Sequence, residues 1–358
     1  MLDGLRPISL LPVISKVFER IIKVSIHKFT LKQNIIPLQQ FGFRENHSTI
    51  HAIHKLVADI NWNLLGKKMT GAVLVDLRKA FDSVWHDGLM YKLKQKKMKN
   101  HLLKMILNMI TGRKFKVTLN GITSCKEFTL TKGLQQGTVN SPTLFNIFTS
   151  ELMKLFNLNQ GEIESIAFAD DQIIYTSDRI LKKIQTRLQG VFEKVINWYK
   201  IWKLGVNSKK CETILFRNTL RKEHEQTKKN WKNFQIKDNL NNIQVPHKRC
   251  VKYLGIHLDD LLRYNQHVNI QIEKAKKAFR SLHGLFYSPY LSKKAKTIAY
   301  LTIIRPIITY GCPIWWNVSA CTMERLRLFE RRILRAWAAI EVTIHTFIRI
   351  HSYVHIAI

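Results

Sequence analysis

Three aspartates at the ends of predicted strands are the residues best suited to chemistry. Asp170 and Asp171 interrupt an apolar stretch, 167–175, whose pattern predicts a β-hairpin with both acids at its tip. Two adjacent like charges are unfavourable unless a cation lies between them. Upstream, the apolar run 72–77 predicts a buried strand with a third acid, Asp76, near its end. If these strands are neighbours, the three carboxylates can bind two Mg²⁺ ions for in-line displacement at a phosphorus.

An acidic pair alone is weak support for a metal site, because most adjacent aspartates are solvated turn residues. The alternative interpretation is an ordinary polar turn at Asp170 and Asp171, with Asp76 simply ending a strand. The apolar strand that leads to each acidic position favours the metal site.

Six short motifs in a fixed order include these acids, and together they are far more specific than any one alone. They are RPISLL at 6–11, QFGFR at 40–44, Asp76 with Phe81 and Asp82, GLQQGTVNSP at 133–142, FADD at 168–171 and KYLG at 252–255. In this order they resemble the reverse transcriptase of non-LTR retrotransposons, and the jockey-like elements of animals look most similar. The resemblance runs motif by motif from residue 6 to about residue 258, and more loosely over the remainder.

The resemblance implies an RNA-directed DNA polymerase, a nucleotidyltransferase that copies RNA into DNA from a primer 3′-hydroxyl. It implies that Asp76, Asp170 and Asp171 bind two Mg²⁺ ions, which Mn²⁺ could replace. Lys210 corresponds to a lysine that protonates the leaving pyrophosphate, although the adjacent Lys209 leaves this alignment open by one residue. The other implied contacts are Arg6, Phe81, Gln136 and Gly137 for the nucleotide, and a primer grip at Tyr253, Leu254 and Gly255.

The chemistry of these residues supports the implied roles but leaves alternatives open. Phe81 has the bulk to exclude a ribose 2′-hydroxyl, yet an aromatic residue after a strand is also typical of a core. The guanidinium of Arg6 suits phosphate oxygens. Gly133 and Gly137 would let the backbone approach a nucleotide at the start of a helix. A simple turn before a helix that begins near Pro142 explains the same glycines.

The composition indicates a folded protein with a polyanionic partner. Apolar residues make up 46% of the chain, and 58 Lys and Arg against 25 Asp and Glu give a net charge of +33. This charge favours a nucleic-acid partner, and the resemblance implies an RNA template, a DNA primer and dNTPs. No membrane is expected, because no apolar run is long enough to span one. The oligomeric state is not predicted.

The sequence also bears on compartment. The first residues lack the basic region and cleavage site of a signal peptide, and the five cysteines show no zinc or disulfide spacing. Free thiols indicate a reducing compartment. We therefore expect an intracellular protein, in the nucleus with a cytoplasmic phase.

Helix and strand patterns are mixed without βα alternation, which predicts an α+β fold with an antiparallel sheet. Helices are expected at 8–31 with Ser9 as a cap, 48–65 with Ser48, 87–97, 100–111, 142–157, 179–203, 264–286, 292–305 and 319–340. Strands are expected at 71–77, 114–120, 125–131, 163–176 (a hairpin), 212–216 and 251–258. The resemblance implies a right-hand polymerase, with fingers and palm over 1–258, an α-helical thumb over 259–340 and an unassigned tail at 341–358.

Two other functions compete with the polymerase. The family has a lysine upstream of Arg6 and an endonuclease domain, and neither falls within this sequence. We therefore expect incomplete fingers, and the alternative is a truncated, catalytically impaired remnant that only binds nucleic acid. A viral RNA-copying RNA polymerase shares the palm and the acidic pair, but such an enzyme needs room for the 2′-hydroxyl, and Phe81 argues against it.

Overall fold

The computed structural model describes residues 8–157, 162–218 and 234–338 of the chain. The chain divides into two compact units, one made of 1–52 and 59–248 and the other of 53–58 and 249–358. Each unit has its own internal packing and is described by itself. Within the described residues, no helix is both long and apolar enough to cross a membrane.

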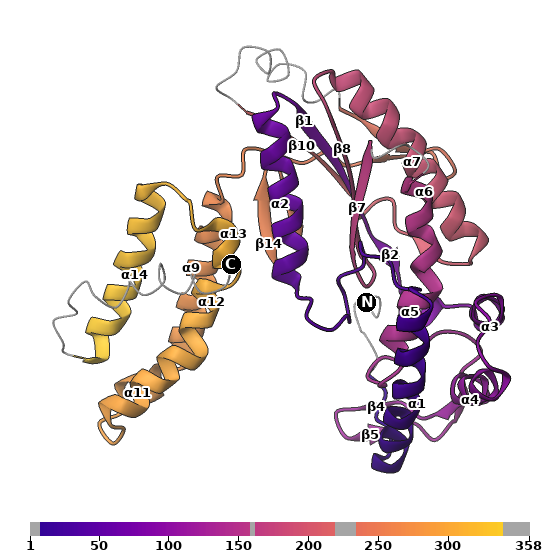
Figure 1. Cartoon of the computed structure of the whole chain (residues 1–358). Helices are drawn as coiled ribbons and strands as arrows, with labels where there is room; N and C mark the ends of the chain where they lie inside the picture. Colours follow the sequence, from indigo (N-terminus) through magenta and orange to yellow (C-terminus); the bar gives the residue numbers. More distant parts are fainter. Residues whose placement is uncertain (1–7, 158–161, 219–233, 339–358) are drawn as a thin grey trace. The chain divides into compact units, whose positions relative to one another are not determined.

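A four-stranded antiparallel sheet forms the centre of the first unit, in the order β10-β1-β8-β7 (Figure 1). Its strands are β1 (Met69–Val75), β7 (Ile163–Phe168), β8 (Asp171–Asp178) and β10 (Glu212–Phe216). The two central strands, β1 and β8, are buried along most of their length, which accounts for their nearly continuous apolar sequences. The predicted antiparallel sheet and the hairpin at 163–176 are confirmed.

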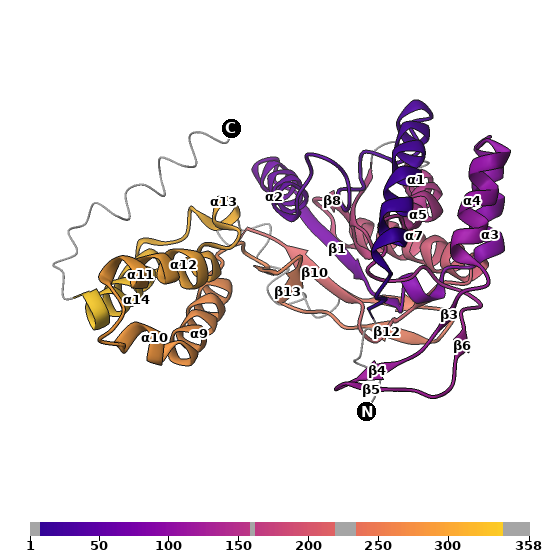
Figure 2. The ribbon, with the colours of Figure 1, turned by 90° about the horizontal axis from the view of Figure 1, so that it is seen from below.

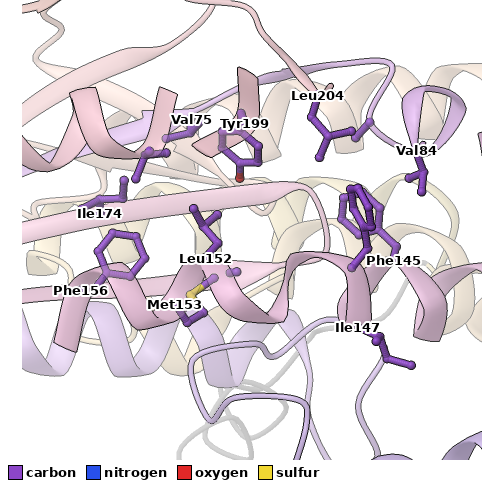
Figure 3. Packing of buried hydrophobic residues seen from close by; sticks show 14 of the residues in the cluster. Val75, Val84, Phe145, Ile147, Leu152, Met153, Phe156, Ile174, Tyr199 and Leu204 are labelled. Atoms are coloured by element: carbon purple, nitrogen blue, oxygen red, sulfur yellow. The ribbon is translucent and has the colours of Figure 1, made fainter. Parts of the chain in front are cut away.

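Helix α7 (Leu181–Ile201) packs against β1 and β8. Gly71 on β1 permits this close packing, because a Cβ atom there would lie 2.4 Å from the Ile184 side chain. Side chains of the sheet, α7 and α5 (Ser141–Thr149) join in one hydrophobic core, part of which Figure 3 shows around Ile174, Tyr199 and Phe145. Burial of this apolar surface is the main favourable term for folding the unit.

The remaining helices between residues 13 and 157 lie where the apolar periodicity predicts them, with shifted ends. Helix α1 (Val13–Lys32) begins after Pro12, so the expected cap at Ser9 is wrong. Ser48 does cap α2 (Thr49–Leu65), because its side chain accepts a hydrogen bond from the His51 amide. The other predicted helices correspond to α3 (His86–Gln95), α4 (Asn100–Ile110) and an interrupted run of α5, the 3₁₀ segment η2 (Ser150–Met153) and α6 (Lys154–Asn157).

The strands predicted at 114–120 and 125–131 are wrong in extent. The structure has four two-residue strands instead, β3 (Lys114–Phe115), β4 (Thr118–Leu119), β5 (Ile122–Thr123) and β6 (Phe128–Thr129), paired as β3 with β6 and β4 with β5. All eight residues are exposed, so the ladder lacks the buried face that sustains longer strands. The other short pairs are β2 (Leu77–Arg78) with β9 (Gly205–Val206), and β11 (Ile236–Asp238) with β12 (Ile243–Val245).

The second unit joins one hairpin to a group of helices (Figure 2). The hairpin is β13 (Cys250–Tyr253) with β14 (Ile256–Asp259), so the single strand predicted over 251–258 is wrong. The chain reverses at Leu254 and Gly255, whose φ values of 45° and 87° are both positive. The helical segments are α9 (Asn265–Ser281), α10 (His283–Tyr287), α11 (Lys293–Ala299), the π-helical η5 (Tyr300–Ile304), α12 (Arg305–Thr309), α13 (Cys312–Trp315) and α14 (Ala320–Ala338). The assignment of fingers, palm and thumb to these residues remains a prediction.

Candidate active site

The acidic pair lies at the turn that joins β7 to β8. Phe168 pairs with Asp171 across the hairpin, so Ala169 and Asp170 form a two-residue turn. Ala169 has a φ of 58°, in the left-handed region that alanine rarely adopts. Asp170 is half-buried and Asp171 is exposed. The hairpin predicted from the apolar pattern therefore presents both carboxylates at its end.

The register of β1 against β8 brings the third aspartate to the same end of the sheet. Val75, the last residue of β1, pairs with Gln172 of β8. Asp76 follows Val75 and Asp171 precedes Gln172, so the two acids stand one step beyond this pair on adjacent strands. The condition stated for the three acids, that their strands are neighbours, is thus met in the backbone.

Buried side chains that are neutral at pH 7 lie next to the three aspartates. The Tyr199 hydroxyl donates to Gln172 Oε1 at 3.0 Å, and the Asp76 amide donates to Cys211 Sγ at 3.4 Å. Burial and the nearby Asp76 carboxylate raise the pKa of the Cys211 thiol to about 11. Burial, with Cys211 and Asp170 adding to it, also raises the pKa of Tyr199. Both groups are therefore protonated near neutral pH.

The donor set fits a hard divalent cation, although the side chains are not gathered around one point. Carboxylate oxygens are the ligands that Mg²⁺ prefers, and three of them stand on adjoining strand ends. Across residues 8–157, 162–218 and 234–338, however, no group of three or more His, Cys, Asp or Glu side chains is arranged to hold a metal ion. The backbone therefore places the three aspartates at neighbouring strand ends, but within the described residues their carboxylates are not arranged around a common metal position.

A loop that contains Gln136 is bonded to the segment that follows Asp76. The Leu134 amide donates to the Phe81 carbonyl at 2.7 Å, and Gln136 Nε2 donates to both carboxylate oxygens of Asp82, at 3.2 and 3.4 Å. These contacts join two sequence motifs into one local structure. Asp82 lies inside the 3₁₀ segment η1 (Phe81–Ser83), whose N-cap is Ala80.

Phe81 combines core packing with partial exposure. Its ring stacks on Phe145 with the centroids 4.6 Å apart, and Phe43 meets it edge to face at 6.4 Å. Phe145 is fully buried, whereas Phe81 is only half-buried and leaves part of its ring accessible. The same residue therefore rests on the core and is still partly exposed.

The close approach that Gly133 permits is to the protein's own backbone. Its φ is 92°, and a Cβ atom at this position would lie 2.5 Å from the Asp82 carbonyl oxygen. Gly137, with a φ of 96°, lies near Ser9, whose amide donates to the Gln136 carbonyl at 2.8 Å. Close packing against the protein's own backbone therefore explains why both positions are glycine. Gly137 is nevertheless exposed and leaves space for a ligand.

Lys210 lies in a turn that is bonded to Asp76. The Asn207 amide donates to the Asp76 carbonyl at 2.8 Å, and the Lys210 amide donates to the Asn207 carbonyl at 2.8 Å. The next residue, Cys211, accepts from the Asp76 amide. The backbone thus brings both Lys209 and Lys210 near the end of the sheet that carries Asp76. Because both lysines are exposed, their positions do not show which of them is the predicted proton donor.

Comparison with known proteins supports the polymerase interpretation. The sequence profile of a family described as reverse transcriptase (RNA-dependent DNA polymerase) matches residues 2–258. The chain belongs to the reverse transcriptase family. The α+β architecture with its antiparallel sheet agrees with the expected polymerase fold.

Relatives of this reverse transcriptase domain come from retrotransposons. It is 30% identical to a probable RNA-directed DNA polymerase from transposon X-element of Drosophila melanogaster, over 95% of this chain and 37% of that protein. It is 29% identical to the RNA-directed DNA polymerase from mobile element jockey of Drosophila funebris, over 93% of this chain and 35% of that protein. The predicted resemblance to jockey-like non-LTR elements is confirmed, and the chain spans about a third of the length of these relatives.

A solved structure of telomerase from Candida albicans, in complex with a fragment of telomeric RNA, aligns with a TM-score of 0.49 and 12% identity. The alignment covers 96% of this chain and 57% of the telomerase chain.

The predicted reverse transcriptase site has two further parts, Arg6 and the primer grip. Arg6 falls outside the described residues. The predicted primer grip lies in the second unit, where the Tyr310 hydroxyl donates to the Leu254 carbonyl at 2.8 Å. A Cβ atom at Gly255 would lie 2.9 Å from the Tyr310 ring, so a side chain, and not another backbone, occupies the space that this glycine leaves.

Two residues of this region had no functional role in the sequence interpretation. Asp82 holds Gln136, and Gln40 bonds to the turn that carries the acidic pair. Both residues belong to the ordered motifs of the sequence, at 40–44 and 76–82, and this membership is the only feature of the sequence that points to a functional role for them. Their contacts span 54 and 129 residues of sequence, a separation that local patterns do not encode.

Proposed function

We propose that this chain is the RNA-directed DNA polymerase of a non-LTR retrotransposon, which copies an RNA template into DNA from a primer 3′-hydroxyl. The observation that carries the proposal is the register of β1 with β8, which brings Asp76 to the end of the sheet where Asp170 and Asp171 form the hairpin tip. Family membership over residues 2–258 supports the same reaction class.

Asp76, Asp170 and Asp171 are the residues that would hold two Mg²⁺ ions, or Mn²⁺ in their place. When bound, such ions lower the pKa of the attacking hydroxyl and neutralise the charge of the triphosphate. The chain's own contribution is to supply oxygen ligands on adjoining strands of a well-packed sheet. The neutral Cys211 and Tyr199 nearby add no negative charge that would compete with the carboxylates.

The nucleotide would lie between the acids and the loop that carries Gln136 and Gly137. Phe81 would contact the sugar and exclude a ribose 2′-hydroxyl by its bulk, which suits a polymerase of DNA. Its exposed ring portion and its firm backing by Phe145 support this role. The two carboxylate oxygens of Asp82 accept hydrogen bonds from the side-chain amide of Gln136. These bonds would orient the Gln136 side chain toward the nucleotide. Arg6 would bind the triphosphate.

Lys210 would donate a proton to the leaving pyrophosphate. A lysine ammonium can act as a general acid when it is placed beside the leaving group. The hydrogen bonds from 207–211 to the Asp76 backbone support this position. Lys209 is the competing residue, and parallel substitutions of the two lysines to glutamine distinguish them by their effects on kcat.

The partners would be an RNA template, a DNA primer and dNTPs. The net charge of +33 supplies the electrostatic attraction for both nucleic acid strands. Tyr253, Leu254 and Gly255 would form the primer grip. Because the product is DNA joined to a primer, the nucleus is the compartment where we expect the reaction to occur.

Extension of a labelled DNA primer on an RNA template, with dNTPs and Mg²⁺, tests the proposal directly. We expect the 358-residue chain to add nucleotides that follow the template sequence, and to stop when the divalent ion is chelated. Binding of primer–template without any template-directed addition would overturn the polymerase proposal and leave a nucleic-acid-binding remnant.

A further inference from the structure

The segment 39–42, within the QFGFR motif, lies alongside the strand that leads to the acidic turn. The Phe41 amide donates to the Ala167 carbonyl at 2.8 Å, and the Ala167 amide donates to the Gln39 carbonyl at 2.9 Å. Gln40 and Ala167 form a parallel β-bridge. These bonds fix the position of the segment relative to β7, two residues before the turn begins.

The buried Gln40 side chain then bonds to the turn itself. Only 2% of Gln40 is exposed, and its Oε1 accepts hydrogen bonds from the Gly42 amide at 2.9 Å and the Ala169 amide at 3.0 Å. Gln40 Nε2 also donates to the Ala169 carbonyl at 3.5 Å. One side-chain amide thus satisfies both backbone polar groups of Ala169, the residue directly before Asp170.

Ala169 is the part of the turn that most needs such support. Its φ of 58° is disfavoured for a residue with a Cβ atom, so the conformation persists only where the surroundings determine it. Without an acceptor, the amide of this half-buried residue would also favour a rearranged turn. Because Asp170 is the next residue, any change at Ala169 would move that carboxylate.

Close packing holds the other side of the segment. A Cβ atom at Gly42 would lie 2.4 Å from the Ala169 nitrogen and 2.8 Å from the Phe168 carbonyl carbon. The buried Asn146 side chain, on α5, donates from Nδ2 to the Gly42 carbonyl at 2.8 Å. The segment is therefore fixed between α5 and the turn, with room only for a glycine at position 42.

We infer that Gln40 is a positioning residue for catalysis, which fixes the Ala169 turn and thereby the orientation of Asp170 and Asp171. The inference rests on the proposed function, because it assigns a purpose to a contact with the acidic pair. Because Gln40 is buried and its amide is bonded to Gly42 and Ala169, we assign it no direct contact with nucleotide or metal. Its effect is exerted through the backbone of the turn.

The main test is Gln40→Leu, which keeps the approximate size of the side chain and removes the acceptor. The kcat per active site, with active sites counted from the burst of first-nucleotide addition, should fall roughly 10- to 100-fold, as for other small displacements of reacting groups. The Mg²⁺ concentration that gives half the maximal rate should rise, while the Kd for primer–template stays within about twofold, since binding depends on distributed cations. A purely structural role would lower the number of active sites and leave the rate of each unchanged.

Gln189→Leu is a matched control. Gln189 also joins distant segments through its side-chain amide, since the Lys237 amide donates to its Oε1 at 2.9 Å and its Nε2 donates to the Lys237 carbonyl at 2.8 Å. That bridge joins α7 to β11, away from the acidic turn. We expect Gln189→Leu to keep the wild-type kcat per active site and the wild-type Mg²⁺ dependence.

Gln40→Asn provides a milder variant if Gln40→Leu does not fold. It keeps the amide but is one methylene shorter, so the acceptor withdraws from the Ala169 amide, and kcat per active site should again fall. If the folded Gln40 variants retain a per-site rate within about twofold of Gln189→Leu, the positioning role is wrong.

Hydrogen exchange over peptides within 163–176 separates this inference from the proposed function. Gln40→Leu, or Gln40→Asn, should speed exchange at the turn relative to Gln189→Leu. If the wild-type chain fails to extend a primer, the polymerase proposal fails, but faster exchange at the turn would still support the contact. Unchanged exchange in folded Gln40 variants would overturn the inference whether or not the chain polymerises.

Discussion

At the scale of single residues, the charge of the neighbouring side chains affects how well the three aspartates can bind a cation. Cys211 and Tyr199 remain neutral near pH 7, because burial raises the pKa of both. A carboxylate beside neutral groups keeps its affinity for cations, whereas a nearby thiolate would compete for the same ion. Asp82 serves a different purpose, since both of its oxygens accept from Gln136. Neighbouring acids in one motif thus have different surroundings, Asp76 at the end of the sheet and Asp82 against Gln136.

Phe81→Ala is expected to weaken discrimination against ribonucleotides. The change removes the ring that would occupy the space of a 2′-hydroxyl, and the ratio of kcat/KM for dNTP over rNTP should fall by at least about tenfold. Single-nucleotide incorporation with each substrate measures this ratio. Phe115→Ala is the control, because it removes a partly exposed aromatic ring from the β3–β6 pair. If both variants keep the wild-type ratio, Phe81 is a core residue only.

At the scale of elements, the buried Lys92 joins α3 to α5 and α7. Its Nζ lies 2.6 Å from the Phe148 carbonyl oxygen, 3.4 Å from Glu151 Oε2, and 3.6 and 4.4 Å from the ring centroids of Trp202 and Trp198. Burial lowers the pKa of Lys92 from 10.5 to about 8, with Glu151 opposing part of that effect. The lowered pKa links the protonation of this one lysine to the stability of the contact between the three helices.

The lowered pKa of Lys92 should make the free energy of unfolding depend on pH. Between pH 8 and 10.5 the unfolded chain keeps the Lys92 proton while the folded chain releases it, so the free energy of unfolding rises with pH. The difference between the two pKa values corresponds to at most about 3 kcal/mol. Denaturant unfolding of the wild type and of Lys92→Met across this range should show the rise only in the wild type.

Lys94→Met on the exposed face of α3 is the control and should keep the wild-type pH dependence. A wild-type curve that is parallel to that of Lys92→Met from pH 8 to 10.5 would contradict the lowered pKa of Lys92.

The elements that could be predicted from the sequence are those whose pattern reflects burial. The apolar pattern of β7 and β8 and the acids that interrupt it predict the hairpin. The position of Asp76 at the same end of the sheet depends on the pairing of β1 with β8, which the apolar pattern alone does not specify. The reversal at Leu254 could not be predicted, because a non-glycine residue adopts a positive φ there. The bonds of Gln40 to Ala169 and of Gln136 to Asp82 depend on tertiary packing between distant segments.

At the scale of the whole molecule, the excess of positive charge determines how nucleic acid binding responds to salt. A protein that neutralises six to ten phosphates loses roughly 10³- to 10⁵-fold in affinity between 50 and 200 mM salt. A chain of net charge +33 should show a dependence of this steepness. The affinity should be largely independent of base sequence, because phosphate contacts carry no sequence information.

Neutralising Lys274 and Lys277, two exposed residues of α9, should lower the slope of log affinity against log salt by about two, one for each lost phosphate contact. Fluorescence anisotropy with a labelled primer–template measures this slope. Lys182 and Lys183, exposed at the start of α7, provide a charge-matched control pair. If both double variants show the same slope as the wild type, α9 does not contact the phosphates.

The central claim, that three aspartates form the centre of a polymerase, is tested most directly by single-nucleotide addition to a DNA primer on an RNA template. Asp76→Asn and Asp170→Asn should each lower the rate by roughly a thousandfold or more, because each removes an ionised ligand worth several kcal/mol in the transition state. The Kd for primer–template should stay within about twofold.

Asp178→Asn is the matched control, since it makes the same change of charge at the other end of β8, where Asp178 pairs with Arg187 at 3.0 Å. We expect Asp178→Asn to retain nearly the wild-type rate of addition per active site, because this side chain lies at the opposite end of β8 from the acidic turn. If Asp76→Asn or Asp170→Asn adds nucleotides as fast as Asp178→Asn, these aspartates are not the catalytic centre and the account is wrong.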